Sequence, residues 1–330
     1  MNDRVVSLGI HASEFPAETR AAILDGLKRG RMPARLLYQL PGQAQRWLDY
    51  HQAYSPSRTD PGLRKLYGVA LAAATAQLDA QPLVAVSLGC GGGHKDADLF
   101  DRIPAEHRRE SRYVPLDTSS ALVLEALLHV TGRHAGVATH PLVVDLEAEP
   151  DLRSWLDGEV PQAYPRLFCA FGLLPNLNPA ALLGYLRRQL RPGDRLLLSA
   201  NLSPQGLAAD GTRILAQYDN APARTWYLGA LENLGVHPSE VMLRVEAVPV
   251  TANGAWWRVA VRAHPQRDLT IRLFGETVSW GAQETLQLFH SHRFTPAALR
   301  ERLHEAGLEP TAVWAGAEGE EGLYLCRPAP

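Results

Sequence analysis

The segment VAVSLGCGGGHK, residues 84–95, decides the fold that we expect for this chain. A short, mainly apolar run, typical of a buried strand, leads directly into Gly89, Gly91, Gly92 and Gly93. Glycines at this point let the backbone turn tightly and approach a ligand without collisions of a Cβ atom. A strand that runs into a glycine loop and then toward a helix indicates a ligand-binding α/β fold.

Strands and helical segments alternate after this loop. The chain before it, from about residue 15 to residue 78, has apolar positions at spacings of three and four residues, which predicts helices. We expect five strands, separated by helical segments, at the sequences VAVSL, YVPLD, LVVD, RLFCA and RLLLSA. Helical crossovers are what parallel strands require, so this alternation predicts a parallel sheet.

The pattern changes after Pro204. A helical segment at 214–235 is followed by alternating sequences that predict an antiparallel meander, with strands at 241–250, 256–265 and 269–280. A capped helix then begins, with Thr295 as its N-cap and Gly307 as its C-cap. The last sequences, TAVWAGAE and EGLYLCRP, predict a hairpin that returns to the parallel sheet.

These elements predict two parts within one chain. We expect a Rossmann-like α/β core formed by residues 63–204 and 293–330. The N-terminal helices and the inserted segment, residues 1–62 and 205–292, would form a second lobe of mixed α+β structure above one edge of the sheet.

The composition excludes several classes of function. The 330 residues are 46% apolar and 21% charged, and the net charge of -2 gives no basic field for nucleic acid or an anionic membrane, so we expect neither partner. Cys90, Cys169 and Cys326 lack CxxC spacing, which argues against a disulfide framework or a zinc site. The sequence shows no signal-peptide pattern and no apolar stretch of roughly 18–20 residues. We expect a cytoplasmic monomer or weak dimer.

Acidic residues follow the glycine loop at the ends of the next two strands. Asp117 can accept hydrogen bonds from ribose hydroxyls, and Asp145 from an adenine amine. The loop reads GCGGG, which matches neither the GxGxxG of a dinucleotide site nor a P-loop. This combination favours S-adenosylmethionine, whose amino-acid portion needs no diphosphate cradle. A nicotinamide dinucleotide is the alternative cofactor, and capping of a helix or loop is the alternative role of each acid.

Seven ordered segments resemble the S-adenosylmethionine-dependent histidine Nα-methyltransferases of ergothioneine biosynthesis. They are SRTD at 57–60, LGCGGGHK at 88–95, YVPLDTS at 113–119, FGLLPNLNP at 171–179, LRPGDRLLLSANL at 190–202, QYDN at 217–220 and HRFTPAAL at 292–299. The resemblance runs from about Tyr54 to the end of the chain. It implies a class I methyltransferase-like Rossmann fold with a second, substrate-capping lobe.

The resemblance also implies which residues hold the cofactor. The S-adenosylmethionine would lie against the positions Gly89, Gly91, Lys95, Asp117, Asp145 and Leu146. The glycine loop itself makes Gly93 a further cofactor-binding candidate. Phe171 is another, because an aromatic ring near the cationic sulfonium gains about 0.5–2 kcal/mol.

An amino-acid substrate would, by the same resemblance, be held by four residues: Tyr54, Asn176, Tyr218 and Ser291. Asn176 and Tyr218 would contact its α-amino and carboxylate ends, which makes them the candidates for a catalytic role. An amide donates and accepts hydrogen bonds, and so does a phenol, so the two can orient a zwitterion without adding net charge. A turn position for Asn176 and a packing role for Tyr218 are the alternatives.

Two departures from the family argue against histidine as the substrate. The family's GSTIGN reads FGLLPN at 171–176, and Phe289 replaces the glutamate that grips the imidazole two residues before Ser291. Loss of one charged hydrogen bond costs roughly 1.5–3 kcal/mol, or about tenfold to a hundredfold in affinity. We therefore expect a transferase that acts on the α-amino group of a different amino acid, with Phe289 in the substrate pocket.

Three alternatives remain open from the sequence. Phe171 and Phe289 could surround the sulfonium, so that the amino group of S-adenosylmethionine attacks its own Cγ and gives azetidine-2-carboxylate and methylthioadenosine. Aminocarboxypropyl transfer would use the same carbon. A protein that binds the cofactor without turnover is the third alternative.

The histidines His290 and His292 invite a metal interpretation. They alternate along an expected strand and so share one face. No carboxylate or cysteine close to them in the sequence completes a ligand set, and we expect no metal.

Overall fold

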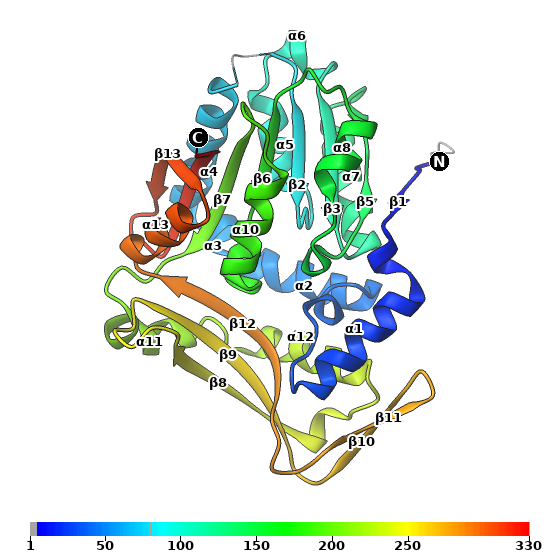
Figure 1. Ribbon diagram of the computed structural model, residues 1–330. Coiled ribbons are helices and arrows are strands. Elements are labelled where there is room, and N and C mark those ends of the chain that lie inside the picture. The colour runs from blue at the N-terminus through cyan, green and yellow to red at the C-terminus, as the bar shows by residue number, and fades with distance from the viewer. Residues whose placement is uncertain (1–4, 79–80, 330) are drawn as a thin grey trace.

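A large sheet with helices on both faces forms one half of the molecule, as the computed structural model shows (Figure 1). The structure describes residues 5–78 and 81–329, so residues 1–4, 79–80 and 330 of the predicted parts lie outside it. The strands of this sheet are ordered β1-β5-β3-β2-β6-β7-β14-β13, with β4 beside β3. Their bounds are β1 Gly9–Ile10, β2 Val84–Leu88, β3 Arg112–Asp117, β4 Ala138–Thr139, β5 Leu142–Val143, β6 Arg166–Ala170, β7 Arg195–Asn201, β13 Leu308–Ala315 and β14 Glu321–Pro328.

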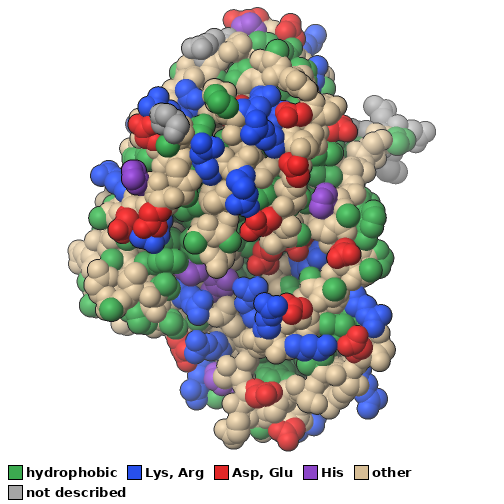
Figure 2. Space-filling model, in the orientation of Figure 1, with side chains coloured by type: hydrophobic (Ala, Val, Ile, Leu, Met, Phe, Trp, Pro, Cys, Tyr) green, Lys and Arg blue, Asp and Glu red, His purple; other side chains and the backbone are tan. Residues whose placement is uncertain are grey.

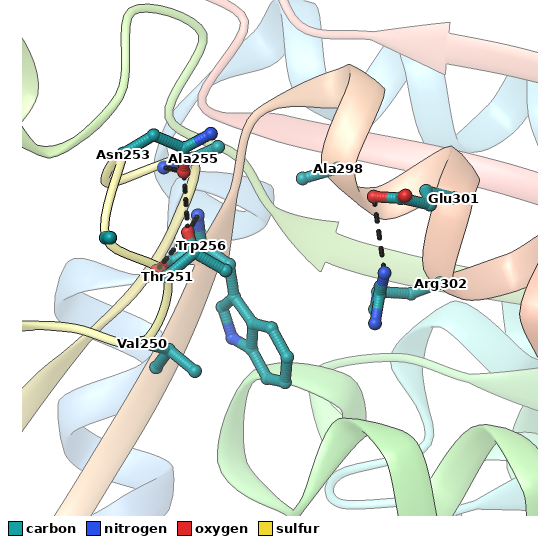
Figure 3. A pocket seen from close by; sticks show the side chains of 9 residues that line it. Val250, Thr251, Asn253, Ala255, Trp256, Ala298, Glu301 and Arg302 are labelled. Atoms are coloured by element: carbon teal, nitrogen blue, oxygen red, sulfur yellow. Dashed lines mark hydrogen bonds and ion pairs between the residues drawn. The ribbon is translucent and has the colours of Figure 1, made fainter.

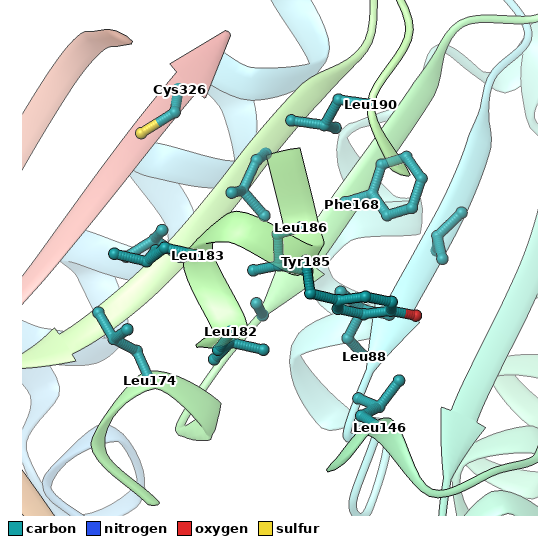
Figure 4. Close-up of a cluster of buried hydrophobic side chains, with 14 of the residues drawn as sticks. Leu88, Leu146, Phe168, Leu174, Leu182, Leu183, Tyr185, Leu186, Leu190 and Cys326 are labelled. Carbon is teal, nitrogen blue, oxygen red and sulfur yellow. The ribbon is translucent and has the colours of Figure 1, made fainter. Parts of the chain in front are cut away.

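The central strands are apolar because both of their faces are covered. Every residue of β2 and β6 is buried, and side chains alternate between two cores: Val84 and Val86 lie in one, Ala85 in the other. One core contains side chains of α4 Pro61–Ala76, α5 His94–Arg102 and α7 Ser120–Arg133. The other contains those of α8 Leu152–Glu159, α10 Pro179–Gln189 and α13 Pro296–Glu305. In Figure 4, leucines of α10 lie among Leu88 and Phe168 of the sheet.

The five strands predicted from the sequence are present and parallel. The predicted C-terminal hairpin is also present, because β14 pairs antiparallel with both β7 and β13. Thr295 caps α13, as predicted, by accepting a hydrogen bond from the amide of Ala298. The C-cap is Ala306 and not the predicted Gly307, which comes one residue later and takes a positive φ of 70°. Parallel strands in this order, with one antiparallel strand next to β7, confirm the class I methyltransferase-like Rossmann fold.

The second half contains a three-stranded antiparallel sheet and the helices packed on it. The sheet order is β12-β9-β8, with β8 Val241–Pro249, β9 Trp256–Pro265 and β12 Leu286–Phe294. A third core joins this sheet to α1 Pro16–Lys28 and α12 Ala221–Glu232, with α11 Leu207–Leu215 beside it. The aromatic residues of α2 Pro41–Tyr54 pack against the same core. The shorter helices are α3 Pro56–Thr59, α6 Ala105–Arg108 and α9 Leu173–Asn176.

Two details differ from the sequence-based expectations. The predicted strand at 269–280 is a hairpin, β10 Leu269–Leu273 and β11 Glu276–Trp280, because Phe274 and Gly275 both take positive φ values of 56° and 80° and reverse the chain. The strand β1, from the segment expected in the second lobe, pairs in parallel with β5 of the large sheet. The division of the chain into two parts stays a prediction.

Candidate functional site

The glycine loop leaves β2 at the carboxyl edge of the large sheet. Gly89, Gly91 and Gly93 have positive φ values of 62°, 51° and 67°, and α5 begins at the next residue, His94. At Gly91 a Cβ atom would lie 2.8 Å from the indole of Trp47 on α2. Only glycine therefore lets this loop lie so close to the second half of the molecule.

Asp117 is bonded directly to this loop. As the last residue of β3, it accepts hydrogen bonds from the amides of Gly91 at 3.3 Å and Ser119 at 3.0 Å. Ser119, and not Asp117, is the N-cap of α7, since its hydroxyl accepts from the amide of Leu122. Burial raises the pKa of Asp117 to about 6, while the three amides that face it act in the opposite direction. A carboxylate has about four acceptor positions, so this one can also accept ribose hydroxyls.

Asp145 follows β5 and lies next to the buried ion pair of Arg35 and Glu14. Its side chain accepts from the amide of Glu147 at 2.9 Å, which caps a short 3₁₀ turn that begins at Leu146. The guanidinium of Arg35 lies 3.4 Å from Asp145 and 2.5 Å from Glu14. Burial raises the pKa of Glu14, and Arg35 opposes this. The N-terminal segment therefore supplies the cation next to this predicted adenine contact.

Lys95, at the start of α5, and Phe171 lie close together. The ammonium of Lys95 is 4.3 Å from the ring centre of Tyr67 and 5.3 Å from that of Phe171. The hydroxyl of Tyr67 donates to Glu321 on β14. Burial lowers the pKa of Lys95, and the charge of Glu321 opposes that effect. This arrangement gives a cation held by aromatic faces beside the glycine loop.

Tyr218 and Ser291 form the centre of a second group of polar side chains. The hydroxyl of Tyr218 donates to Ser291 at 2.8 Å. The amide of Asn201 donates to Ser291 at 3.0 Å and to Tyr218 at 3.3 Å. Arg293 also donates to the hydroxyl of Tyr218, at 3.3 Å. We call these four residues the Tyr218 cluster; it joins β7, β12 and the turn before α12.

Phe289 lies beside the Tyr218 cluster in a group of aromatic rings. Its ring centre is 6.1 Å from that of Tyr218, 5.5 Å from Trp226 and 5.6 Å from Tyr227. Phe289 is 8% exposed and belongs to the apolar core of the second half. The position therefore offers apolar contact and no hydrogen-bond acceptor.

A family model identifies the family of this chain. The model described as "Histidine-specific methyltransferase, SAM-dependent" matches residues 19–328. The chain belongs to this family. It is an S-adenosylmethionine-dependent methyltransferase in family and fold, and S-adenosylmethionine is its cofactor.

Individual proteins resemble this methyltransferase to different degrees. The histidine N-alpha-methyltransferase of Mycolicibacterium smegmatis is 26% identical over 283 residues, which make up 82% of each chain. Among solved structures, an S-adenosylmethionine-dependent methyltransferase from Clostridium acetobutylicum has a TM-score of 0.46 at 10% identity, over 87% of this chain and 99% of that one. The magnesium protoporphyrin IX methyltransferase of Synechocystis has a TM-score of 0.45 at 13% identity, over 88% and 96%.

Two predicted substrate residues of the methyltransferase lie outside the Tyr218 cluster. Tyr54, at the end of α2, is 47% exposed and stacks on Tyr50 at 5.6 Å between ring centres. The hydroxyl of Tyr50 in turn donates to the carbonyl of Gln217, next to Tyr218. Asn176 ends α9, which packs against β12, and its half-buried side chain makes no hydrogen bond to the residues that the structure describes.

Sequence reasoning assigned no role to Asn201 and Arg293 of the Tyr218 cluster. Arg293 is 3% exposed and also donates to the carbonyl of Leu202 and the side chain of Gln217. Both residues lie inside segments that resemble the family, 190–202 and 292–299. The resemblance of these two segments to the family is the signal that could have identified Asn201 and Arg293 as candidate site residues.

A pocket of about 470 Å³ lies away from these residues, between the β8–β9 turn and α13 (Figure 3). Its charged wall consists of Glu301 and Arg302, which pair with each other at 3.2 Å. Arg302 also pairs with Glu305 at 2.6 Å. This pocket therefore offers no unpaired charge for a ligand.

The described part of the chain contains neither a cluster of metal ligands nor a membrane-spanning helix. Within 5–78 and 81–329, no group of three or more His, Cys, Asp or Glu side chains is arranged to hold a metal ion. No helix in that part of the chain has the length and apolar character that a membrane span requires.

Proposed function

We propose that this methyltransferase acts on the α-amino group of an amino acid other than histidine. The observation that carries the proposal is the Tyr218 cluster, which presents hydroxyl and amide groups directly beside the apolar surface of Phe289. Polar groups of this kind bind the α-amino and carboxylate ends of an amino acid, and an apolar wall selects its side chain. The histidine N-alpha-methyltransferase relative supports an α-amino group as the acceptor.

The residues around the glycine loop fit S-adenosylmethionine. Asp117 retains acceptor positions for ribose hydroxyls, and the glycine loop to which it is bonded carries no side chain at Gly91 that could block the approach of the cofactor to the backbone. Asp145 and Leu146 would contact the adenine, and Gly89, Gly93, Lys95 and Phe171 would lie near the amino-acid portion. The cofactor supplies a methyl group on a sulfonium, which is already an activated electrophile.

The protein's own contribution is then orientation and exclusion of water. Tyr218 cannot rotate freely, because Ser291, Asn201 and Arg293 all bond its hydroxyl. A substrate N–H that replaces Asn201 or Arg293 as a donor to this oxygen would be held with its nitrogen lone pair free for the methyl group, and Asn176 would hold the other end of the same substrate. The proton that the amine loses after transfer passes to water.

Phe289 opposes histidine as the substrate. Three aromatic rings surround it, at the position where the family resemblance implies a glutamate for the imidazole. An imidazole placed there would lose a charged hydrogen bond, a cost of roughly 1.5–3 kcal/mol. An apolar or aromatic amino acid has no such group to satisfy.

Aromatic side chains favour one second candidate, an S-adenosylmethionine cyclase. Phe171 beside the glycine loop and Phe289 beside Tyr218 would present their rings to the sulfonium. In that reaction the N–Cγ bond forms, the Cγ–S bond breaks with its electron pair on sulfur, and the amine proton goes to water. The products are azetidine-2-carboxylate and methylthioadenosine; aminocarboxypropyl transfer breaks the same bond with an outside amine.

One incubation separates these reactions. The purified enzyme is given S-adenosylmethionine alone and then with a pool of the twenty amino acids, and products are identified by mass spectrometry. We expect S-adenosylhomocysteine only with the pool, together with depletion of one amino acid other than histidine. Methylthioadenosine formed without an acceptor, faster than in a heat-inactivated control, would establish the cyclase. Depletion of histidine would overturn our substrate assignment, and bound cofactor without product would indicate a binding protein.

A further inference from the structure

A groove of about 530 Å³ opens on the opposite side of β12 from the Tyr218 cluster. Its wall includes six residues that matter here: Arg29, Arg31, Trp256, Arg258, His290 and His292. Side chains alternate along a strand, so His290 and His292 face this groove while Ser291 faces Tyr218. Figure 2 shows histidines beside Lys or Arg side chains at the level of β12. We call this feature the arginine–histidine groove.

The residues that line the groove carry positive charge, and one of its three arginines, Arg258, has no carboxylate partner within residues 5–78 and 81–329. No Asp or Glu lines it within the part of the chain that the structure describes. Arg29 pairs with Asp25 at 3.0 Å, and Arg31 lies 3.9 Å from Glu147.

Arg258 has neither an ion pair nor a hydrogen bond among the described side chains, and its Nε atom is buried without a partner. Burial lowers its pKa, and the charges of Arg262 and Arg31 add to this effect. A half-buried guanidinium among other guanidinium groups is unfavourable unless an anion joins them.

The histidines add neutral donors to these cations. The indole Nε1 of Trp256 donates to Nδ1 of His292 at 2.9 Å, which places the histidine proton on Nε2. The amide of Gln287 lies 3.2 Å from Nδ1 of His290, which favours the same tautomer. Burial lowers the pKa of His290 to about 4 and that of His292 to about 3, so both rings are neutral at pH 7.

We propose that the arginine–histidine groove binds a small oxyanion, a phosphate or carboxylate group of a small molecule, at a site separate from the methyl-transfer site. A guanidinium presents donors in the planar geometry that such groups accept, and Arg258 is not engaged by the protein itself. The volume of the groove lies in the range of small-molecule sites, and the indole of Trp256 gives the rest of such a molecule an apolar surface.

Isothermal titration tests this proposal with inorganic phosphate and with citrate, each at low ionic strength and with saturating S-adenosylhomocysteine. The nucleoside blocks the cofactor site, so heat that persists reports a different site. The matched variants are Arg258→Gln and Arg262→Gln. Arg262 lies on the same strand but outside the groove, and it pairs with Glu246 at 2.9 Å. We expect Arg258→Gln to weaken anion binding at least about tenfold, and Arg262→Gln, which removes an equal charge outside the groove, to weaken it much less.

The two anions identify the chemistry: tighter phosphate indicates a phosphate-bearing ligand, and tighter citrate a carboxylate. Thermal melting gives a second measurement, because Arg258→Gln should melt at a higher temperature than wild type without anion and lose the stabilisation that anions give wild type. Equal weakening in both variants would show general charge attraction only and overturn the proposal. So would an absence of binding at millimolar anion, or binding that S-adenosylhomocysteine abolishes.

Discussion

Tyr218 and Tyr227 are two buried phenols with different surroundings. The hydroxyl of Tyr218 bonds Ser291, Asn201 and Arg293. That of Tyr227 is buried and has no hydrogen-bond partner in the described structure. Both rings pack on Phe289, so removal of either hydroxyl leaves the aromatic contacts in place.

We predict that Tyr218→Phe lowers kcat/KM for the amine acceptor by about tenfold to a hundredfold, because a positioned hydrogen bond is lost. The free energy of unfolding should fall by about 1–3 kcal/mol, since Arg293 and Asn201 lose an acceptor. Tyr227→Phe is the matched control: it should leave kcat/KM unchanged and should not lower the free energy of unfolding, because the hydroxyl that it removes is buried without a partner. Steady-state assays and urea titrations measure both, and equal activity of the two variants would contradict a role for the Tyr218 hydroxyl.

Asp117 connects stability and cofactor binding through one proton. The folded protein keeps this proton up to about pH 6, whereas an ordinary aspartate loses it near 3.8. The folded state therefore binds more protons between these values, and stability present below pH 3.8 is lost as the pH rises through 6. Ribose hydroxyls bind better to the ionised carboxylate, so cofactor affinity changes in the opposite direction.

We predict that wild type binds S-adenosylhomocysteine up to about tenfold more weakly at pH 5 than at pH 7, as linkage to one proton requires. Asp117→Asn should bind about tenfold more weakly at pH 7 and show a flatter pH profile. The variant should also gain stability relative to wild type between pH 5 and pH 7. Titration calorimetry and thermal melting at both pH values are the measurements; a variant profile as steep as that of wild type would exclude Asp117 as the titrating group.

At the scale of elements, the loop between β2 and α5 depends on close backbone packing. Gly93 has a φ of 67° and lies close to Ala126 on α7. A Cβ atom at Gly93 would be 2.6 Å from the Cα atom of Ala126 and 2.8 Å from its carbonyl oxygen. Gly132, in the same helix α7, has no atom within 4 Å of its Cβ position.

We predict that Gly93→Ala lowers the free energy of unfolding by at least about 2 kcal/mol, because both the left-handed backbone and the helix contact become unfavourable. It should also weaken binding of S-adenosylhomocysteine, since the loop must move away from α7. Gly132→Ala should stabilise the protein by about 0.5–1 kcal/mol through helix propensity. Denaturant titrations measure the free energy of unfolding of both variants. Similar values would show that the loop can move away from α7 at no cost, which would contradict this prediction.

The elements that the sequence predicted well are those with local signals. Buried apolar runs that end in glycine or aspartate marked β2, β3 and β6, and these strands lie in the predicted parallel sheet. The segment 269–280 was predicted as one strand because its alternating pattern continues through the turn of the hairpin. At that turn Phe274 takes a φ of 56°, which bulky residues rarely adopt. The two-residue strand β1 is exposed and carries no periodic pattern.

The candidate site divides in the same way. Asp117 and the glycine loop could be predicted from local sequence, because each directly follows a strand that has a clear apolar pattern. These two strands, β3 and β2, are parallel neighbours, so their ends lie close enough for the hydrogen bond between Asp117 and Gly91. The Tyr218 cluster brings together Asn201, Tyr218 and Arg293 from segments up to 92 residues apart. No local pattern predicts this convergence, which depends on how β12 meets β7.

Across the molecule, buried ion pairs connect the N-terminal segment to the large sheet. The side chain of Arg35 is 1% exposed and bonds both Glu14 and Asp145. Thr118, which follows β3, donates to Glu14 at 3.0 Å. An ion pair near the surface in the same half, Arg20 with Glu276 at 3.1 Å, leaves both side chains more than 40% exposed.

We predict that Arg35→Ala lowers the free energy of unfolding by about 3–5 kcal/mol, because two carboxylates lose their cation inside the protein. Arg20→Ala, the exposed control, should change it by no more than about 0.5 kcal/mol, since water screens that pair. Arg35→Ala should also weaken S-adenosylhomocysteine, because Asp145 is freed to move away from the adenine position. Urea titration and calorimetry of both variants measure these effects. If both arginines prove equally dispensable, the N-terminal segment is held to the sheet by apolar packing, and Asp145 is positioned by the amide of Glu147 alone.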